Sequence, residues 1–208
     1  MHRFGLPKFR NSQNGLRIER PRRISHAERI TIGNNVTLGP GCWLIPIVGY
    51  PPRKFARCEK EVDQQQFDPH IEIGNNVTAT ANLQVFCQER IVVEDDVMFA
   101  SNVFINDGSH GFLEADTPYK YQKIFRISPV TIKRGCWVGQ NVVIMPGVTL
   151  GEMCIIGANS VVTKSLPSRS IAAGSPASII SVWDPMAGAW AKIHRSGQTT
   201  GALDPRGV

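Results

Sequence analysis

Residues 130–162 read VTIKRGCWVGQNVVIMPGVTLGEMCIIGANSVV. An aliphatic residue recurs in this stretch every six positions, at Ile132, Val138, Ile144, Leu150, Ile156 and Val162. A period of six matches neither the 3.6-residue period of an amphipathic helix nor the simple alternation of a half-buried strand. It predicts a solenoid of short strands, each followed by a turn, in which the aliphatic side chains point inward and stack from coil to coil.

The same period runs through the upstream sequence, but with interruptions. The hexamer IGNNVT occurs at residues 32–37 and again at 73–78. Three hexamers make one coil of 18 residues, so equivalent positions in successive coils should lie 18 apart. The coil starts are Ile32, Ile73, Val93, Ile132 and Leu150, which are 41, 20, 39 and 18 residues apart. The excesses over 18 predict an insertion of 23 residues within Ile45–His70, a two-residue bulge near Cys87–Arg90 and an insertion of 21 residues within Asp107–Pro129.

Glycine and asparagine occupy the positions where the coils must turn. Gly33-Asn34-Asn35, Gly74-Asn75-Asn76 and Gly157-Ala158-Asn159 follow three of the repeat aliphatics. These residue types adopt positive φ angles at the lowest cost. The pattern therefore predicts an all-β protein, a parallel β-helix with two loop insertions.

The ends of the chain depart from the repeat. Residues 1–29 hold eight Lys or Arg and two Glu, and we expect a basic arm or capping segment there. We expect the β-helix domain over residues 30–182 and a short C-terminal tail over 183–208. Within that tail we expect a short helix from about Pro185 to His194.

The overall composition limits the function classes. The chain has 208 residues, a formal net charge of +6 and no run of 18 apolar residues, so we expect no transmembrane helix. The N-terminus lacks the apolar stretch of a secretory signal, and we expect a cytoplasmic protein. The positive charge favours anionic partners. The five cysteines show no zinc spacing, and the histidines show no metal-binding spacing, so we expect no metal site.

The segment WVGQNVVIMPGVTLGEMCIIGANSVVTKSLPSRSIAAGSPASII, residues 137–180, resembles the hexapeptide-repeat acyltransferases, whose fold is a left-handed β-helix. Within that family the chain is most similar to the sugar and polysaccharide O-acetyltransferases. The pieces ERITIGNNVTLGPGCWLI and MFASNVFINDGSHGF share the resemblance. It implies acetyl-CoA as co-substrate, a sugar or polysaccharide acceptor, and a homotrimer with the coenzyme bound between subunits.

A histidine in the second insertion matches the family's catalytic position. Acetyl transfer to a hydroxyl needs a base near pH 7, and histidine is the side chain whose pKa suits that task. His110, in INDGSHGF, lies where the resembling enzymes carry their catalytic histidine. Asp107, Glu114 and Asp116 are nearby in sequence and are candidates to orient it.

The resemblance also implies roles for residues outside this loop. It assigns Asn82 to the acceptor hydroxyl and the backbone N–H of Gln140 to the oxyanion. It assigns the coenzyme to Trp137, Gly139, Ala158, Thr163, Lys164, Pro176 and Ala177. Relatives often carry arginines near the last of these, where this chain has Ser178 and Ser181. Lys164, or Lys192 and Arg195 of the tail, would then bind the coenzyme phosphate.

Two other interpretations stay open on the sequence alone. An acetyltransferase of the same fold could act on an amino sugar, serine or an antibiotic. A non-catalytic β-helix scaffold could bind nucleic acid through its basic arm, although a helix-turn-helix, zinc spacing and RNP-like aromatics are all missing from the sequence.

Overall fold

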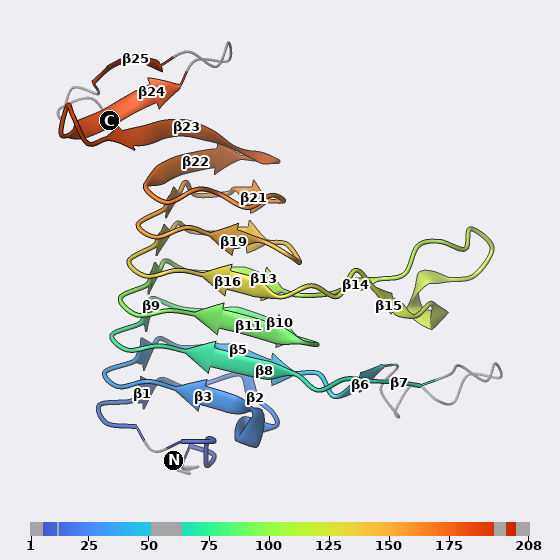
Figure 1. The fold of residues 1–208 in the computed structure, drawn as a ribbon. Coiled ribbons are helices and arrows are strands. Elements are labelled where there is room, and N and C mark those ends of the chain that lie inside the picture. The colour runs from blue at the N-terminus through green and yellow to red at the C-terminus, as the bar shows by residue number, and fades with distance from the viewer. Residues whose placement is uncertain (1–5, 12, 51–63, 194–198, 203–208) are drawn as a thin grey trace.

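The computed structural model describes residues 6–11, 13–50, 64–193 and 199–202. They form a three-faced prism of stacked coils, with two loops that project from one side (Figure 1). In Figure 1 the strands of the near face run leftward, the chain turns at the left edge, and it returns rightward behind them while it rises from the N-terminus at the bottom. Each coil therefore winds left-handed, as the resemblance implies.

Three sheets form the faces of the prism, and all strand pairs within its coils are parallel. Sheet A contains, in order, β1 (Arg17–Ile18), β4 (Thr37–Leu38), β9 (Thr78–Ala79), β12 (Met98–Phe99), β17 (Trp137–Val138), β20 (Ile155–Ile156), β22 (Ser170–Gly174), β23 (Ala177–Asp184), β24 (Ala189–Ile193) and β25 (Thr199–Ala202). Sheet B contains β2 (Arg23–Ile24), β5 (Trp43–Pro46), β10 (Gln84–Cys87), β13 (Phe104–Asn106), β18 (Val143–Ile144) and β21 (Val161–Val162). Sheet C contains β3 (Ile30–Ile32), β8 (His70–Ile73), β11 (Arg90–Val93), β16 (Val130–Ile132) and β19 (Thr149–Leu150).

The repeat aliphatics stack inside the prism as the period predicts. Ile132 pairs with Leu150 in the next coil, and Val93 links Ile73 below to Ile132 above. Each of these side chains is at most 3% exposed. At one end of the stack Phe9 is 5% exposed and covers the first coils, where β1 and β2 of the basic N-terminal segment pair with β4 and β5. Burial of these apolar side chains is the main stabilising term of the prism.

The corners are built by asparagine, as expected. Asn35, Asn76 and Asn159 have φ angles of 56°, 56° and 58°. At the corner between sheets A and B the side-chain amides form a ladder, in which each asparagine donates to the one in the next coil. Its members are Asn82, Asn102, Asn141 and Asn159, at distances of 2.9, 3.0 and 2.9 Å. The ladder satisfies polar groups that the turns would otherwise leave unpaired.

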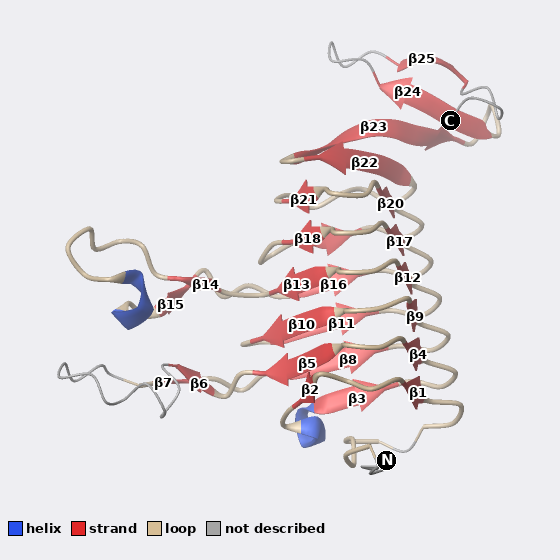
Figure 2. Ribbon diagram, turned by 180° about the vertical axis from the view of Figure 1, so that it is seen from behind, coloured by secondary structure: helices blue, strands red, loops and turns tan. Residues whose placement is uncertain are grey.

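Both predicted insertions leave the prism at the corner between sheets B and C, next to each other (Figure 2). The first carries the two-stranded ribbon β6 (Gly49–Tyr50) and β7 (Gln65–Gln66). The second carries β14 (Ser109–His110), β15 (Ile124–Phe125) and the 3-10 turn η3 (Tyr119–Tyr121). A second 3-10 turn, η1 (Ala27–Arg29), precedes β3, and the described residues contain no α-helix.

The helix expected from about Pro185 to His194 is wrong. Strands β23 and β24 form an antiparallel hairpin there, with Trp183 opposite Trp190 and their ring centroids 5.6 Å apart. The Asp184 Oδ1 accepts hydrogen bonds from the N–H groups of Met186 and Ala187, which closes the turn. The cross-strand aromatic pair and this turn outweigh the helical propensity of the segment. His194 and Arg195 lie outside the described residues.

Candidate active site

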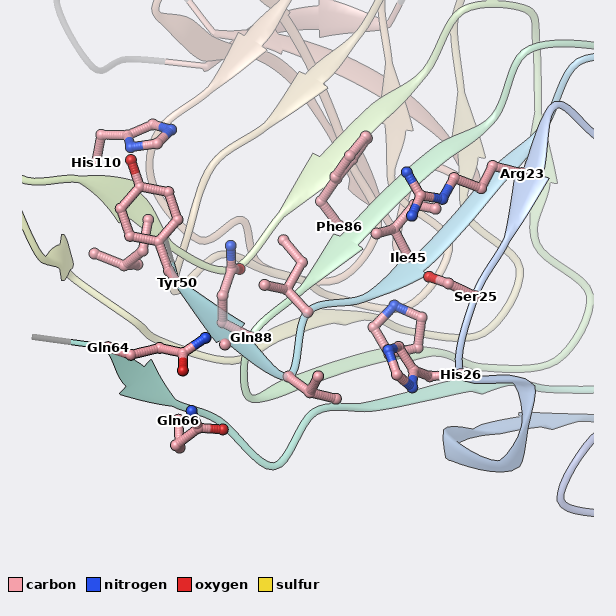
Figure 3. Close-up of a pocket in the computed structure, with 15 residues that line it drawn as sticks. Arg23, Ser25, His26, Ile45, Tyr50, Gln64, Gln66, Phe86, Gln88 and His110 are labelled. Carbon is pink, nitrogen blue, oxygen red and sulfur yellow. The ribbon is translucent and has the colours of Figure 1, made fainter. Parts of the chain in front are cut away.

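A cavity lies between the outer face of sheet B and the two insertions. Its volume is about 740 Å³, within the range of small-molecule sites. Sheet B contributes Arg23, Ile45 and Phe86, while the insertions contribute Tyr50 and His110 among others. Figure 3 shows His110, Tyr50 and Gln88 on one side of the cavity and Arg23, Ser25 and His26 on the other. Most of the surface between these two sides is apolar.

His110 sits on a short strand at the wall of this cavity. It pairs with Ile124 across the antiparallel ribbon β14–β15, so its backbone is fixed although its side chain is exposed. The ring of Tyr50 approaches the imidazole edge-on, with 5.1 Å between the ring centroids. An exposed imidazole held in this way can reach a ligand in the cavity and exchange a proton with it.

The first insertion braces the ribbon that carries His110. The Ile124 N–H donates to Gln65 Oε1 at 2.6 Å, and Gln65 Nε2 donates to the Ile124 carbonyl at 3.2 Å. The Tyr50 hydroxyl donates to the Lys120 carbonyl at 2.6 Å. Burial raises the pKa of Tyr50 above its ordinary value, which keeps the hydroxyl protonated as a donor near neutral pH. Sequence reasoning missed these bracing residues.

Asp107, one of the carboxylates considered as a partner for His110, has a different role. It is fully buried and accepts hydrogen bonds from the backbone N–H groups of Gln88, Glu89 and Arg90 at 2.6–2.8 Å. These residues are the two-residue bulge that the repeat spacing predicts. Within the described part of the chain no carboxylate bonds to His110, and this includes Glu114 and Asp116.

The bulge that Asp107 holds turns Gln88 into the cavity. Gln88 is only 5% exposed, and its Oε1 accepts no hydrogen bond from the described residues. A buried carbonyl oxygen without a donor costs free energy unless a ligand or water supplies one. In the sequence, the two-residue excess in the coil spacing points to a bulge at this position. It does not indicate that the Gln88 side chain faces a cavity.

The other candidate residues lie elsewhere on the prism. Asn82 lies in the asparagine ladder, where its Nδ2 donates to Asn102. The coenzyme candidates lie on sheet A, at its corner with sheet B, on the hairpin turn that follows β22 and, for Thr163 and Lys164, at the corner between sheets B and C. None of these residues lines the cavity of His110: Asn82, Trp137, Gly139, Gln140, Ala158, Thr163, Lys164, Pro176 and Ala177. A single chain therefore does not bring them together with His110.

Several features of that second surface suit a long ligand. Trp137 is 48% exposed and, with Met153 and Trp190, lines a groove of about 490 Å³. The Gln140 N–H donates to no other described residue. Thr163 and Lys164 are exposed where the chain passes from β21 of sheet B toward sheet C. Gly139 lies so close to the next coil that a Cβ there would be 2.6 Å from the Ile156 carbonyl oxygen.

Among the described residues, no group of three or more His, Cys, Asp or Glu is arranged to hold a metal ion. No helix in the described chain is long and apolar enough to cross a membrane. Cys42, Cys136 and Cys154 are buried in the core as free thiols.

Comparison with known proteins connects this architecture to acetyl transfer. Residues 129–164 match the family described as bacterial transferase hexapeptide (six repeats). The galactoside O-acetyltransferase of Escherichia coli K12 is 29% identical over 180 residues, covering 85% of this chain and 80% of the relative. The putative lipopolysaccharide biosynthesis O-acetyl transferase WbbJ of the same organism is 32% identical, covering 59% of this chain and 65% of the relative.

Solved structures agree with the fold. Galactoside acetyltransferase in complex with coenzyme A superposes with a TM-score of 0.52 at 34% identity, covering 57% of this chain and 58% of that structure. A mutant of AntD, an N-acyltransferase from Bacillus cereus, in complex with dTDP and coenzyme A gives a TM-score of 0.64 at 20% identity. It covers 86% of this chain and 87% of that structure, and at this identity the likeness concerns the fold alone.

Proposed function

Because this chain belongs to the hexapeptide-repeat acetyltransferase family, we propose that it transfers an acetyl group from acetyl-CoA to a hydroxyl of a sugar or cell-surface polysaccharide. The acceptor occupies the cavity beside His110. This proposal is supported by the sugar O-acetyltransferases among the relatives and by the position of His110 on the cavity wall.

His110 acts as the general base. Its imidazole removes the proton of the acceptor hydroxyl, and the oxygen forms a bond to the acetyl carbonyl carbon. The carbon–sulfur bond then breaks, and the imidazolium of His110 returns the proton to the leaving sulfur. The Gln140 N–H, which donates to no other described residue, donates to the oxyanion of the tetrahedral intermediate.

The observation that carries this proposal is the bracing of the His110 strand. A general base must be held within hydrogen-bonding reach of one proton, and an unsupported exposed loop would not hold it. Gln65 and Tyr50 fix the ribbon from a separate insertion, and the imidazole faces the cavity on the side shared with Gln88.

The coenzyme binds along sheet A, its corner with sheet B and the turn that follows β21. Trp137 and Gly139 would contact the pantetheine, while Lys164, with Thr163 and Ala158, would face the phosphate groups. Pro176 and Ala177 lie toward the adenine. Since these residues are remote from the cavity of the same chain, a second copy must present them to His110. A homotrimer with the coenzyme between subunits meets this requirement, and Asn82 of the ladder would contact the acceptor from the second copy.

The proposal is tested by an acceptor screen with purified protein and acetyl-CoA, in which thiol release and acetylated product are both measured. We expect thiol release that depends on a sugar acceptor, with a product that hydroxylamine cleaves because it is an ester. A product stable to hydroxylamine would indicate an amide and an amino acceptor. Failure of any sugar to raise thiol release above the rate of hydrolysis would contradict the proposal.

A further inference from the structure

The cavity beside His110 is lined by an arginine and two histidines. Arg23, His26 and His110 belong to its lining, and no Asp or Glu among the described residues does. Arg23 lies on β2, and its guanidinium extends over the outer face of sheet B toward Phe86 (Figure 3). The two sides of the cavity therefore differ, with the base at one and the arginine at the other.

Arg23 lines the cavity, and three other arginines of the N-terminal segment have partners outside it. Arg17 pairs with Glu19 at 2.7 Å, and Arg29 pairs with Asp68. Arg22 lies over the Trp43 ring, 5.6 Å from its centroid. In the described chain no carboxylate pairs with Arg23. A guanidinium with unused donors in a concave site suits a carboxylate or a phosphate.

Gln88 provides a second, independent constraint on the ligand of this cavity. Its buried Oε1 accepts no hydrogen bond from any described residue, and the Gln88 side chain lies on the same side of the cavity as His110 and Tyr50. A neutral hydroxyl donor from a ligand would satisfy this oxygen, whereas an anion would be repelled by it. The cavity therefore fits a ligand that has a hydroxyl donor near His110 and an anionic group near Arg23. The apolar surface of Ile45 and Phe86 lies between these two positions.

We propose, building on the acetyl transfer proposed above, that the acceptor is an anionic sugar. Arg23 binds its carboxylate or phosphate, and Gln88 accepts a hydrogen bond from a hydroxyl beside the one that faces His110. The sugar ring would cover Phe86 and Ile45. A neutral galactoside would fill the hydroxyl side alone and leave Arg23 without a partner.

The test is equilibrium binding, which needs no turnover. Isothermal titration calorimetry compares methyl galactoside with methyl galacturonide and galactose 1-phosphate, using the full chain in the presence of coenzyme A. We expect at least one of the two anionic sugars to bind about tenfold or more tightly than the neutral one, since hydrogen bonds to charged groups are worth that much. The stronger of the two anionic ligands identifies the anion as carboxylate or phosphate.

Variants separate the two contacts. Arg23→Gln should bring the ratio of anionic to neutral affinity to about 1, while Arg22→Gln, which removes the same charge outside the cavity, should keep the wild-type ratio. Gln88→Leu should weaken all three sugars by a similar factor and leave the ratio intact. In each variant the affinity for acetyl-CoA should match that of the wild type.

The inference is overturned if neither anionic sugar binds more tightly than the neutral one. It is overturned equally if Arg23→Gln keeps the preference or weakens acetyl-CoA binding instead, since Arg23 would then serve the coenzyme. Binding that depends on Arg23 without any acetylated product would support the anion site and count against the proposed acetyl transfer, so the two failures are distinguishable.

Discussion

The side-chain amide of Gln65 pairs with the backbone of Ile124 as a strand would. It accepts from the Ile124 N–H at 2.6 Å and donates to the Ile124 carbonyl at 3.2 Å. Ile124 in turn lies directly opposite His110 in the ribbon β14–β15. The first insertion therefore controls the position of the proposed base, although the two insertions follow β5 and β13, which are separated in sheet B by β10.

Replacement of Gln65 should impair turnover more than binding. Gln65→Leu removes both hydrogen bonds to Ile124 and loosens the His110 strand, so we expect kcat to fall about tenfold, as expected for a misplaced base. The KM for acetyl-CoA should stay near the wild-type value. Steady-state thiol release measures both constants. Gln84→Leu, the same change on sheet B outside the cavity, serves as control, and an equal loss there would show that bracing is not the cause.

Asp107 should matter for stability, because its carboxylate holds the bulge. Asp107→Asn replaces an acceptor of three backbone N–H groups by a side chain with one carbonyl oxygen. We expect the free energy of unfolding to fall by about 2–3 kcal/mol. Urea denaturation followed by circular dichroism gives the value. The exposed Asp116→Asn should change it by less than about 0.5 kcal/mol, and a similar loss in both variants would refute the role.

The asparagine ladder allows backbone conformation to be separated from hydrogen bonding. Asn102 has a φ of 61° and bonds to Asn82 and Asn141. Asn102→Ala and Asn102→Gly lose the same two hydrogen bonds, but only glycine tolerates this φ without strain. We expect the alanine variant to be less stable than the glycine variant by about 1 kcal/mol. Equal stabilities in urea denaturation would mean that the positive φ carries no cost here.

The coenzyme surface is tested by charge reversal at Lys164. Lys164→Glu should raise the KM for acetyl-CoA about tenfold through loss of a phosphate contact and added repulsion. The effect should shrink at high ionic strength. Lys8→Glu, an exposed position in the N-terminal segment, makes the same charge change away from the proposed coenzyme surface. A rise in KM of the same size in that variant would point to the overall charge of the protein and not to a local contact.

How far the sequence alone predicts this structure depends on the region. The six-residue period placed Ile132, Val138 and Ile144 in the core, and its phase shifts located both insertions, because every coil repeats the same constraint. No period governs the inside of an insertion, so the pairing of Gln65 with Ile124 could not be inferred. The hairpin of Trp183 and Trp190 was missed for a related reason, since cross-strand contacts of a single turn leave no repeat in the sequence.

The residues of the candidate site also differ in how far the sequence predicts them. The sequence predicts His110 as a candidate base because the family motif and the repeat frame around it coincide. Gln88 and Arg23, by contrast, are specific to the cavity that the insertions create over sheet B. Asp107 lies three residues from His110 in sequence, yet its carboxylate points to the bulge. Proximity in sequence is a poor guide to side-chain partners inside a loop.

The central claim is that His110 is the general base of an acetyl transfer, and the most direct measurement is thiol release by His110→Ala. We expect kcat to fall by several hundredfold or more, within the range of about 10²–10⁴ typical of a lost general base. The affinity for acetyl-CoA should remain unchanged, and His70→Ala, a change of the same kind outside the cavity, should keep the wild-type kcat. A His110→Ala enzyme that retains more than about one tenth of the wild-type kcat would contradict the account.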